Sequence, residues 1–268
     1  MLIHWNFDPV MISIGPLAIR WYGLLFVGAF LTGQTIIGRL FKAEGVDPKI
    51  AENLLLYALL GCVIGARLAH CFFYDPHYYL THPLEILRIW KGGLASHGGA
   101  VGLLLGLWLG NRSLKPPLPF LWLVDRITIP AALGAVFVRG ANFLNSEIIG
   151  MPTSGNWGVV FEAVDKQPRH PAQLYEAAAY LCIWLILTAL YRRQREKTPY
   201  GLLAGWFLIL VFTARIVVEF FKAPQAAYAT EQIFRVGQYL SLPFVIVGIV
   251  MVLWTRKRPV PDTKPPRK

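Results

Sequence analysis

Seven long apolar segments restrict the fold of this chain more than any other feature of its sequence. They span residues 21–37, 51–73, 94–109, 118–138, 172–190, 201–221 and 236–254. A helix needs about 20 mostly apolar residues to cross a hydrocarbon core of roughly 30 Å. Only 15% of the residues are charged, against about 25% in soluble domains. We therefore predict an all-α integral membrane protein with about seven transmembrane helices, of which the third segment is the shortest and is rich in glycine.

The polar intervals between these segments are short, and none is large enough to fold as a soluble domain. The longest, residues 139–173, contains the turn-forming run Met-Pro-Thr-Ser-Gly-Asn-Trp-Gly. We expect this interval to form a small extracytoplasmic (periplasmic) head. Residues 255–268 form a basic tail. Residues 1–268 as a whole are expected to be a single polytopic membrane domain.

The distribution of lysine and arginine predicts the orientation of the chain. Fifteen of them lie in the intervals 38–50, 110–117 and 191–200 and in the tail, whereas the opposite set of intervals holds seven. Short loops rich in these residues stay in the cytoplasm. We therefore expect a cytoplasmic tail, with the N-terminus and the head outside. The net charge of +11 is then explained by topology, and no nucleic-acid partner is expected.

Several charged residues lie inside or at the ends of the apolar segments. The arginines among them are Arg67, Arg126, Arg139 and Arg215. A charge at the centre of a bilayer costs roughly 2.5–3.5 kcal/mol on insertion scales, so such residues are candidates for function. Ion pairing is the structural alternative, because Glu219 follows Arg215 by four residues on the same helix face. We interpret Asp125 and Arg126 as a structural pair that snorkels near the inner end of its segment.

The remaining polar side chains are expected at one depth. With the predicted orientation, the outer half of the membrane contains Tyr22, Arg67, His97, Arg139 and Arg215. Structural ion pairs alone would be scattered in depth. Several arginines together indicate a site for an anion, and the anion of a membrane is a phospholipid phosphate, which the planar guanidinium binds through two hydrogen bonds.

Two polar runs accompany these arginines. After Arg139, the structural interpretation is that the side chains of Asn142, Asn145 and Glu147 bond exposed backbone as the chain leaves its helix, and that Gly150 allows a turn at positive φ. This interpretation does not explain an arginine at the start of the run, so near the apolar core. The run Ser-His-Gly-Gly places the titratable ring of His97 beside glycines that leave room for a ligand. A structural histidine near a helix end is the alternative interpretation.

The charged residues and polar runs described above belong to motifs that follow one another in an order characteristic of one family. The chain resembles the bacterial prolipoprotein diacylglyceryl transferases over nearly its whole length. The resemblance rests on Arg20-Trp-Tyr-Gly23, Gly65-Ala-Arg67, Gly92-Gly-Leu-Ala-Ser-His-Gly-Gly99, Arg139-Gly-Ala-Asn-Phe-Leu-Asn-Ser-Glu-Ile-Ile-Gly150, Arg169-His-Pro-Ala-Gln-Leu-Tyr-Glu176 and Arg215-Ile-Val-Val-Glu219. It implies a seven-helix bundle in the bacterial plasma (inner) membrane. It also implies an enzyme that moves the diacylglyceryl group of phosphatidylglycerol to the lipobox cysteine of a preprolipoprotein signal peptide, releasing glycerol 1-phosphate.

The resemblance also implies which residues act. The positions that match the family's functional residues are Tyr22, His97, Arg139, Asn142, Glu147, Gly150, Arg215 and Glu219, and Arg67 is added as a substrate-binding candidate. We expect Arg139 and Arg215 to bind the phosphate, with Glu219 orienting Arg215. His97 is the candidate base, Tyr22 and Asn142 are expected at the lipid headgroup, and Glu147 and Gly150 are expected to shape the head.

The chain departs from the family at two positions. Val211 stands where the family often has tyrosine, and some members have tyrosine at the position of His97. No metal or dissociable cofactor is expected, because the sequence lacks an HExxH motif and a phosphate-binding loop. The three cysteines, Cys62, Cys71 and Cys182, are expected to pack in apolar segments.

Two other functions use similar residues. A transporter or binding protein for anionic lipids would also need membrane arginines, but it would more often show repeated halves, and none is visible. An intramembrane protease would need a catalytic dyad. Ser96 and His97 are adjacent in sequence, which is a poor geometry for a dyad, and no GxSxG motif is present.

Overall fold

The computed structural model describes all residues except 16, 90–91, 224–235 and 257–268. The chain divides into two compact units. The first contains the described parts of Met1–Gly33 and Leu121–Thr263, and the second contains Gln34–Phe120. The expectation of a single membrane domain over residues 1–268 stays a prediction.

Seven helices correspond one to one to the seven predicted apolar segments. They are α1 (Trp21–Ala43), α2 (Lys49–Phe73), α4 (Ser96–Ser113), α5 (Phe120–Leu144), α6 (Ala172–Gln194), α7 (Leu202–Glu219) and α8 (Val236–Arg256). Among the described residues, six are long and apolar enough to cross a membrane, and α4 is the exception. Glycines and polar terminal residues lower the hydropathy of α4. The all-α membrane class is confirmed.

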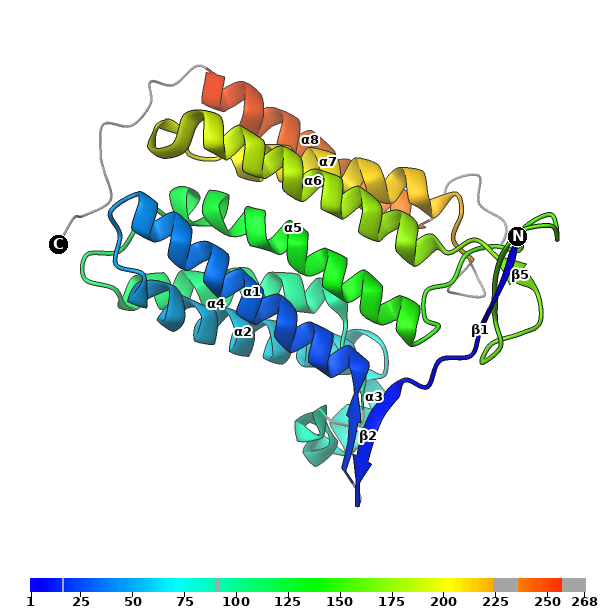
Figure 1. Cartoon of the computed structure of the whole chain (residues 1–268). Helices are drawn as coiled ribbons and strands as arrows, with labels where there is room; N and C mark the ends of the chain where they lie inside the picture. The colour runs from blue at the N-terminus through cyan, green and yellow to red at the C-terminus, as the bar shows by residue number, and fades with distance from the viewer. Residues whose placement is uncertain (16, 90–91, 224–235, 257–268) are drawn as a thin grey trace. The chain divides into compact units, whose positions relative to one another are not determined.

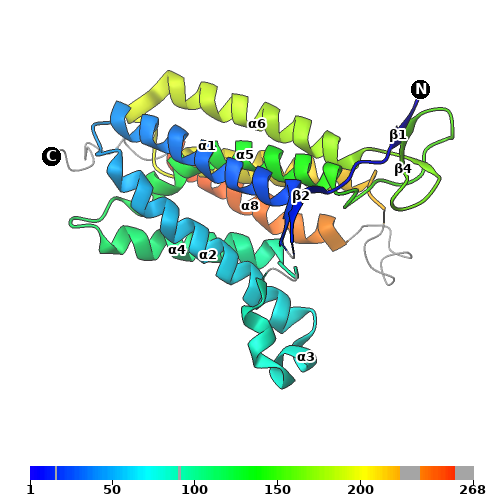
Figure 2. The same cartoon turned by 60° about the horizontal axis from the view of Figure 1, so that its bottom comes forward.

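The second unit is built on contacts between α2 and α4. The contacting glycines are Gly61 and Gly65 on α2 and Gly98, Gly102 and Gly106 on α4. A Cβ atom added to Gly102 would lie 2.9 Å from the Cα of Gly65, so the two backbones touch. Small residues four apart allow this close approach between membrane helices. The connection between the two helices contains α3 (Pro76–Thr81) and the short helix η1 (Pro83–Leu87), and Figure 2 shows α3 beyond their ends.

In the first unit, α5 to α8 lie side by side (Figure 1). Asp125 of α5 accepts hydrogen bonds from the backbone N–H groups of Gly201 (2.7 Å) and Ala204 (2.8 Å) at the start of α7. A carboxylate is favourable at a helix N-terminus. Arg126 lies against the rings of Trp122 and Tyr191.

The interpretation of Asp125 and Arg126 as snorkelling residues was therefore wrong, although their role is structural. Neither side chain has exposed area, and their charged atoms are 3.9 Å apart. The carboxylate is hydrogen-bonded to the start of α7 and the guanidinium lies over aromatic rings, so both groups make their contacts within the protein.

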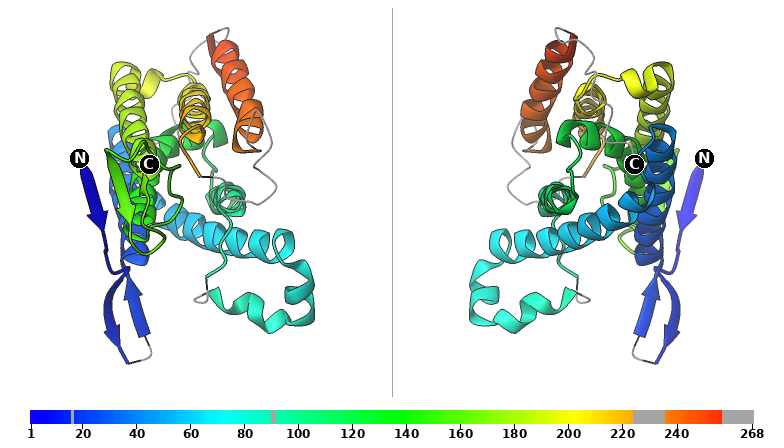
Figure 3. Two further views of the ribbon diagram at one scale, coloured as in Figure 1. Left: turned by 90° about the vertical axis from the view of Figure 1, so that its right-hand side faces the viewer. Right: turned by 90° about the vertical axis from the view of Figure 1, so that its left-hand side faces the viewer.

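The head contains a sheet that the sequence did not predict. Strand β1 (Leu2–Trp5) pairs in parallel with β4 (Gly158–Phe161), which pairs with β5 (Pro168–Arg169). Figure 1 shows β1 and β5 beyond the C-terminal end of α5 and the N-terminal end of α6. A hairpin of β2 (Val10–Ile14) and β3 (Leu17–Arg20) leads from β1 to the start of α1 (Figure 3).

The predicted limits of the head and the tail stay predictions. Helix α5 continues to Leu144, so the first six residues of the predicted head, 139–144, are still helical. Of the basic tail 255–268, only Thr255 and Arg256 are described, at the end of α8, and the rest lies outside the described residues.

Candidate active site

Charged side chains from α5 and α6 meet at one end of the first unit. Glu176, one turn into α6, has a side chain with no exposed area. Its Oε2 atom lies 2.7 Å from Nε of Arg139, which is near the C-terminal end of α5. The Tyr180 hydroxyl donates to the other oxygen at 3.4 Å. A carboxylate can remain charged at such depth only when it is paired and hydrogen-bonded.

Lys222, just after α7, continues this arrangement. Its ammonium donates to Oε1 of Glu176 at 2.9 Å and lies 3.6 Å from Oε2 of Glu219. The side chain of Lys222 is only 5% exposed. Arg139, Glu176, Lys222 and Glu219 therefore form one continuous chain of ionic contacts, which we call the charge junction.

Arg215 lies beside the charge junction and is differently placed. It is half-buried on α7, and among the described residues no side chain forms an ion pair or hydrogen bond with it. Its charge and that of Arg139 both act on the hydroxyl of Tyr180. The predicted ion pair between Arg215 and Glu219 is absent from the described part of the chain. Glu219 contacts Lys222 instead, because Lys222 lies one turn later and is also held by Glu176.

Arg139 is held from a second direction by the amide of Asn142. Its Nη1 donates to Oδ1 of Asn142 at 2.9 Å, and Nδ2 of Asn142 donates to Glu147 at 3.0 Å. Asn145 also donates to Glu147, at 3.2 Å. The expectation that these side chains bond the backbone at a helix end was wrong, because α5 continues past Asn142 and its amide instead links two charged groups.

Gly150 is required for close packing rather than for turning. Positive φ occurs instead at Ser146 and Ile148, each at 55°, so the structural interpretation of Gly150 as a positive-φ turn was wrong. A Cβ atom on Gly150 would lie 2.8 Å from the carbonyl oxygen of Phe221 and would also overlap the carbonyl of His170. The segment after α5 therefore passes directly between the start of α6 and the end of α7.

Arg169 attaches this segment to the head. Its Nη1 donates to the carbonyl of Gly150 at 3.1 Å, and its Nε donates to Asp165 at 3.0 Å. The Arg169 hydrogen bond holds the pKa of Asp165 below its ordinary value. Gln173 at the start of α6 donates to the carbonyl of Glu147 at 2.6 Å. Gly150 and Glu147 are thus fixed by residues of the His-Pro-Ala-Gln-Leu-Tyr-Glu run and its neighbours.

The second unit contains Arg67 and His97. Arg67 is buried and donates to the backbone carbonyls of Glu85 (2.6 Å), Ile86 (2.9 Å) and Gly92 (2.6 Å), with a further contact to Gly93. Its guanidinium is therefore occupied in holding the connection between α2 and α4. His97, the second residue of α4, is exposed.

Tyr22, by contrast, is half-buried at the start of α1 and belongs to the first unit. The expectation that all five outer residues share one depth stays a prediction.

Two members of the charge junction were missed in the sequence. Lys222 was counted only as a loop charge, and Glu176 was not selected as a site residue. Glu176 lies in the apolar segment 172–190, where a carboxylate is as costly as the arginines that were selected. The position of Glu176 in an apolar segment could therefore have identified it from the sequence. Its partners could be identified only from the tertiary structure.

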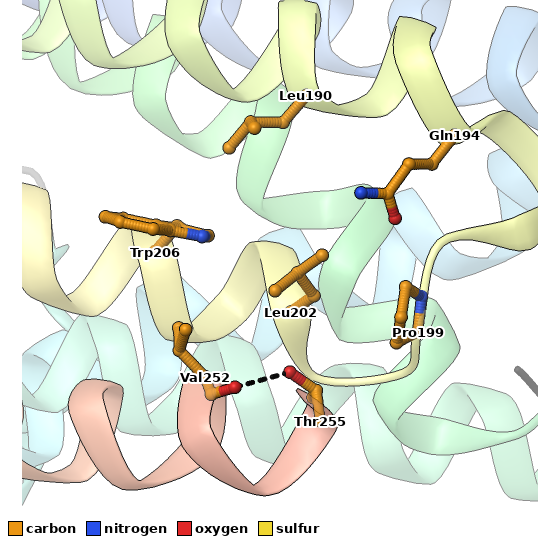
Figure 4. Close-up of a pocket in the computed structure, with 7 residues that line it drawn as sticks. All are labelled: Leu190, Gln194, Pro199, Leu202, Trp206, Val252 and Thr255. Atoms are coloured by element: carbon orange, nitrogen blue, oxygen red, sulfur yellow. Dashed lines mark hydrogen bonds between the residues drawn. The ribbon is translucent and has the colours of Figure 1, made fainter. Parts of the chain in front are cut away.

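A cavity of about 270 Å³ lies elsewhere in the first unit (Figure 4). It is lined by Leu190, Gln194, Pro199, Leu202, Trp206, Val252 and Thr255. The rise of 1.5 Å per residue along α6 puts Leu190 roughly 20 Å from Glu176. The cavity is mostly apolar and is separate from the charge junction. Within the described residues, no group of three or more His, Cys, Asp or Glu side chains is arranged to hold a metal ion.

Comparison with known proteins identifies the family. The family model described as prolipoprotein diacylglyceryl transferase matches residues 9–254. The chain belongs to this family. A relative from Tolumonas auensis is 52% identical over 96% of this chain and 98% of its own length. Relatives from Chloroherpeton thalassium and Bacteroides fragilis are 45% and 41% identical, each over 96% of this chain, with 95% and 96% of their own lengths covered. All three are named phosphatidylglycerol–prolipoprotein diacylglyceryl transferase.

Membership in the diacylglyceryl transferase family confirms the resemblance and identifies the chain as an enzyme. The match includes every candidate residue from Tyr22 to Glu219. The six apolar helices agree with a multi-pass membrane transferase. The comparisons give no support to the alternative of a transporter or binding protein for anionic lipids.

Proposed function

We propose that this transferase moves the diacylglyceryl group of phosphatidylglycerol to the lipobox cysteine of a preprolipoprotein signal peptide and releases glycerol 1-phosphate. The names of the relatives give the two substrates. The observation that supports an anionic lipid substrate in this chain is the pair of arginines near Tyr180. Arg139 is held in place by Glu176 and Asn142, whereas Arg215 has no ion-pair partner among the described residues.

The reaction is a displacement at carbon. The cysteine sulfur forms a bond to the glyceryl carbon that carries the phosphate, and the bond between that carbon and the phosphate oxygen breaks. The electron pair of the broken bond stays on the oxygen, so the phosphate changes from one negative charge to two. The thiol proton must leave as well. Cationic groups that favour the second negative charge therefore lower the barrier more than they favour substrate binding.

Arg139 and Arg215 fit this requirement in different ways. The contacts of Arg139 with Glu176 and Asn142 fix the guanidinium before the substrate arrives, which avoids reorganisation during the reaction. Arg215 is half-buried, so its charge is less screened by water than that of a surface arginine. We assign both guanidinium groups to the phosphate oxygens, to which they can each donate two hydrogen bonds.

We assign His97 as the base that accepts the thiol proton. A free cysteine ionises at about pH 8.5, so a base or a stabilising environment is needed near neutral pH. The exposed position of His97 at the start of α4 leaves its ring accessible to a substrate. Tyr22 and Asn142 are assigned to the lipid headgroup, and Glu147 and Gly150 to the shape of the segment beside it. Arg67 is assigned to positioning, because its donors are used on backbone carbonyls.

The enzyme is proposed to lie in the bacterial inner membrane with its N-terminus and head outside and its C-terminus in the cytoplasm. The pairing of β1 with β4 supports part of this orientation, because it requires the N-terminal residues and the head to be on the same side. The excess of basic residues in the other set of loops supports the choice of side. A cysteine-labelling reagent that cannot cross membranes should label a cysteine at position 155 and leave one at position 265 unlabelled.

The direct test uses the purified full-length chain in vesicles of phosphatidylglycerol with a synthetic signal peptide that contains one lipobox cysteine. We expect the peptide to gain the mass of a diacylglyceryl group while an equal amount of glycerol phosphate is released. A peptide with serine in place of the cysteine, and vesicles of phosphatidylcholine, are the controls. Transport of lipid without peptide modification, or phosphate release that does not depend on the thiol, would contradict the proposal.

A further inference from the structure

The environment of Glu176 is unusual because one buried carboxylate is shared between two cations. Oε2 lies 2.7 Å from Arg139, and Oε1 accepts a hydrogen bond from Lys222 at 2.9 Å. The Glu176 side chain has no exposed area, and that of Lys222 is 5% exposed. Solvent therefore screens neither contact strongly, and the charges of the three residues act on each other and on any neighbouring ligand.

The charge balance of these three residues matters for the bound phosphate. Arg139 with Glu176 alone would be a neutral pair, and its attraction for an anion would be largely cancelled. Lys222 adds a second positive charge beside the same carboxylate, and Glu219, 3.6 Å from Lys222, brings the four residues of the charge junction to a net charge of zero. Without Lys222, the junction would have a net charge of −1. We propose that Glu176 and Lys222 act jointly as positioning residues, in which Glu176 fixes Arg139 and Lys222 offsets the carboxylate so that Arg139 still attracts phosphate. This inference rests on the proposed function of the site.

The position of Lys222 is fixed by the backbone as well as by its ion pairs. Lys222 forms an isolated β-bridge with Gly150, and the flanking hydrogen bonds run from Ala223 N–H to Ile149 (3.0 Å) and from Met151 N–H to Phe221 (2.8 Å). The ammonium is therefore held at the junction of α7 with the segment after α5. The same bridge brings Gly150 beside the residue that offsets Glu176.

A purely structural role predicts something different. If Lys222 only joined α6 to α7, loss of its charge would lower stability without a specific effect on lipid binding. Loss of both members of the pair would then be at least as harmful as loss of one. Under charge compensation, Lys222→Met leaves the charge junction with a net charge of −1, whereas the double variant Glu176→Gln/Lys222→Met removes one charge of each sign and restores the net charge of the wild type.

The experiment compares the full-length wild type with Lys222→Met, Lys222→Arg and the double variant in detergent micelles. The shift in the thermal unfolding temperature on addition of phosphatidylglycerol gives an apparent lipid affinity without requiring turnover. We expect Lys222→Met to weaken this affinity at least about tenfold, in the range of coupling between contacting charged residues. Lys222→Arg should keep it within about threefold, and the double variant should recover most of the loss. Lys166→Met, at an exposed lysine of the head, is the matched control and should bind as the wild type does.

Each outcome decides between the two roles. Wild-type affinity in Lys222→Met, or a double variant that binds no better than Lys222→Met, would overturn the inference. A Lys222→Met protein that does not fold, beside a double variant that folds and binds lipid, supports it. Failure of both variants to fold would assign the pair a structural role and also overturn it. A wild type that binds phosphatidylglycerol but modifies no peptide would overturn the proposed function instead, and the affinity comparison would still judge the positioning role.

Discussion

The glycine contact of the second unit and the charge junction of the first hold helices together by opposite means, although α7 and α8 of the first unit also approach closely at Gly205 and Gly248. In the second unit, α2 and α4 touch through glycines, so that the backbone of one helix lies directly against the backbone of the other. In the first unit, the ends of α5, α6 and α7 are connected through the charge junction. Neither contact relies on the hydrophobic effect, which provides little driving force between helices surrounded by lipid tails.

The difference shows how a membrane enzyme can separate structure from chemistry. A glycine contact leaves no group free to react and does not depend on pH or salt. Buried charges are more costly, but they leave cations near a site that must bind an anion. The two arginines Arg67 and Arg215 illustrate the contrast, because the first uses its donors on backbone carbonyls and the second has no ion-pair partner within the described residues.

The largest expected effect is at the glycine contact. Gly102→Leu would place a side chain against the backbone of α2, which cannot move aside as a side chain could. We expect a loss of more than about 3 kcal/mol of stability, seen as loss of folded protein in size-exclusion chromatography. The matched control is Gly38→Leu on α1, where a Cβ atom meets only Pro48 at 4.0 Å and the fold should survive. A folded and active Gly102→Leu protein would show that the contact is not needed.

The next effect concerns Arg139 and Arg215, the two arginines assigned to the phosphate. Arg139→Lys and Arg215→Lys should each lower kcat by roughly 10²–10³-fold, because a point charge does not reproduce the planar guanidinium. Both variants should keep the thermal stability of the wild type within about 1–2 kcal/mol, in contrast to Gly102→Leu. Near-normal turnover in either variant would remove that residue from the phosphate site.

A smaller and pH-dependent effect is expected at His97. His97→Gln keeps a hydrogen-bonding side chain but cannot accept the thiol proton. We expect turnover at neutral pH to fall by about 10²-fold, at the lower end of the range for general bases. Activity should recover partly at alkaline pH, where the thiol ionises without a base. Full turnover at neutral pH, or an unchanged pH profile, would show that His97 is structural.

The smallest effect is expected at the surface of the head. The hydrogen bond from Arg169 lowers the pKa of Asp165, so the carboxylate contributes stability above its ordinary pKa of about 3.9 and loses that contribution as the pH falls through the lowered value. Asp165→Asn should cost less than about 1 kcal/mol at pH 7, as is usual for partly exposed ion pairs. In thermal unfolding, the difference from the wild type should shrink as the pH falls below about 4. A difference that grows in acid would contradict this assignment.

The seven long helices were predictable because each corresponds to a long apolar segment, and six of them are long and apolar enough to cross a membrane. The seven apolar segments predicted the helices, and their charges pointed to Arg139 and Arg215. The local roles of polar residues were predicted less well. The side chain of Asn142 was expected to bond backbone, but periodicity does not show where a helix ends, and α5 continues by several residues.

The remaining features depend on residues that are distant in the sequence. Glu176 and Lys222 are 46 residues apart, and their contact follows from the positions of α6 and α7 together. The reason for glycine at position 150 also lies elsewhere, at the carbonyls of His170 and Phe221. A single sequence indicates that a buried charge needs a partner, but not which residue supplies it.

The pairing of β1 with β4 has a consequence for the synthesis of the protein. Residues 2–5 are made before their partner strand, which follows about 155 residues later, as the contact of Met1 with Asn156 illustrates. At a synthesis rate of about 5–20 residues per second, the first strand waits roughly 8–30 s, while four of the long helices are produced. Assembly of the head is therefore a late event, and an emerging N-terminus must be kept from other pairings until residues 158–161 arrive.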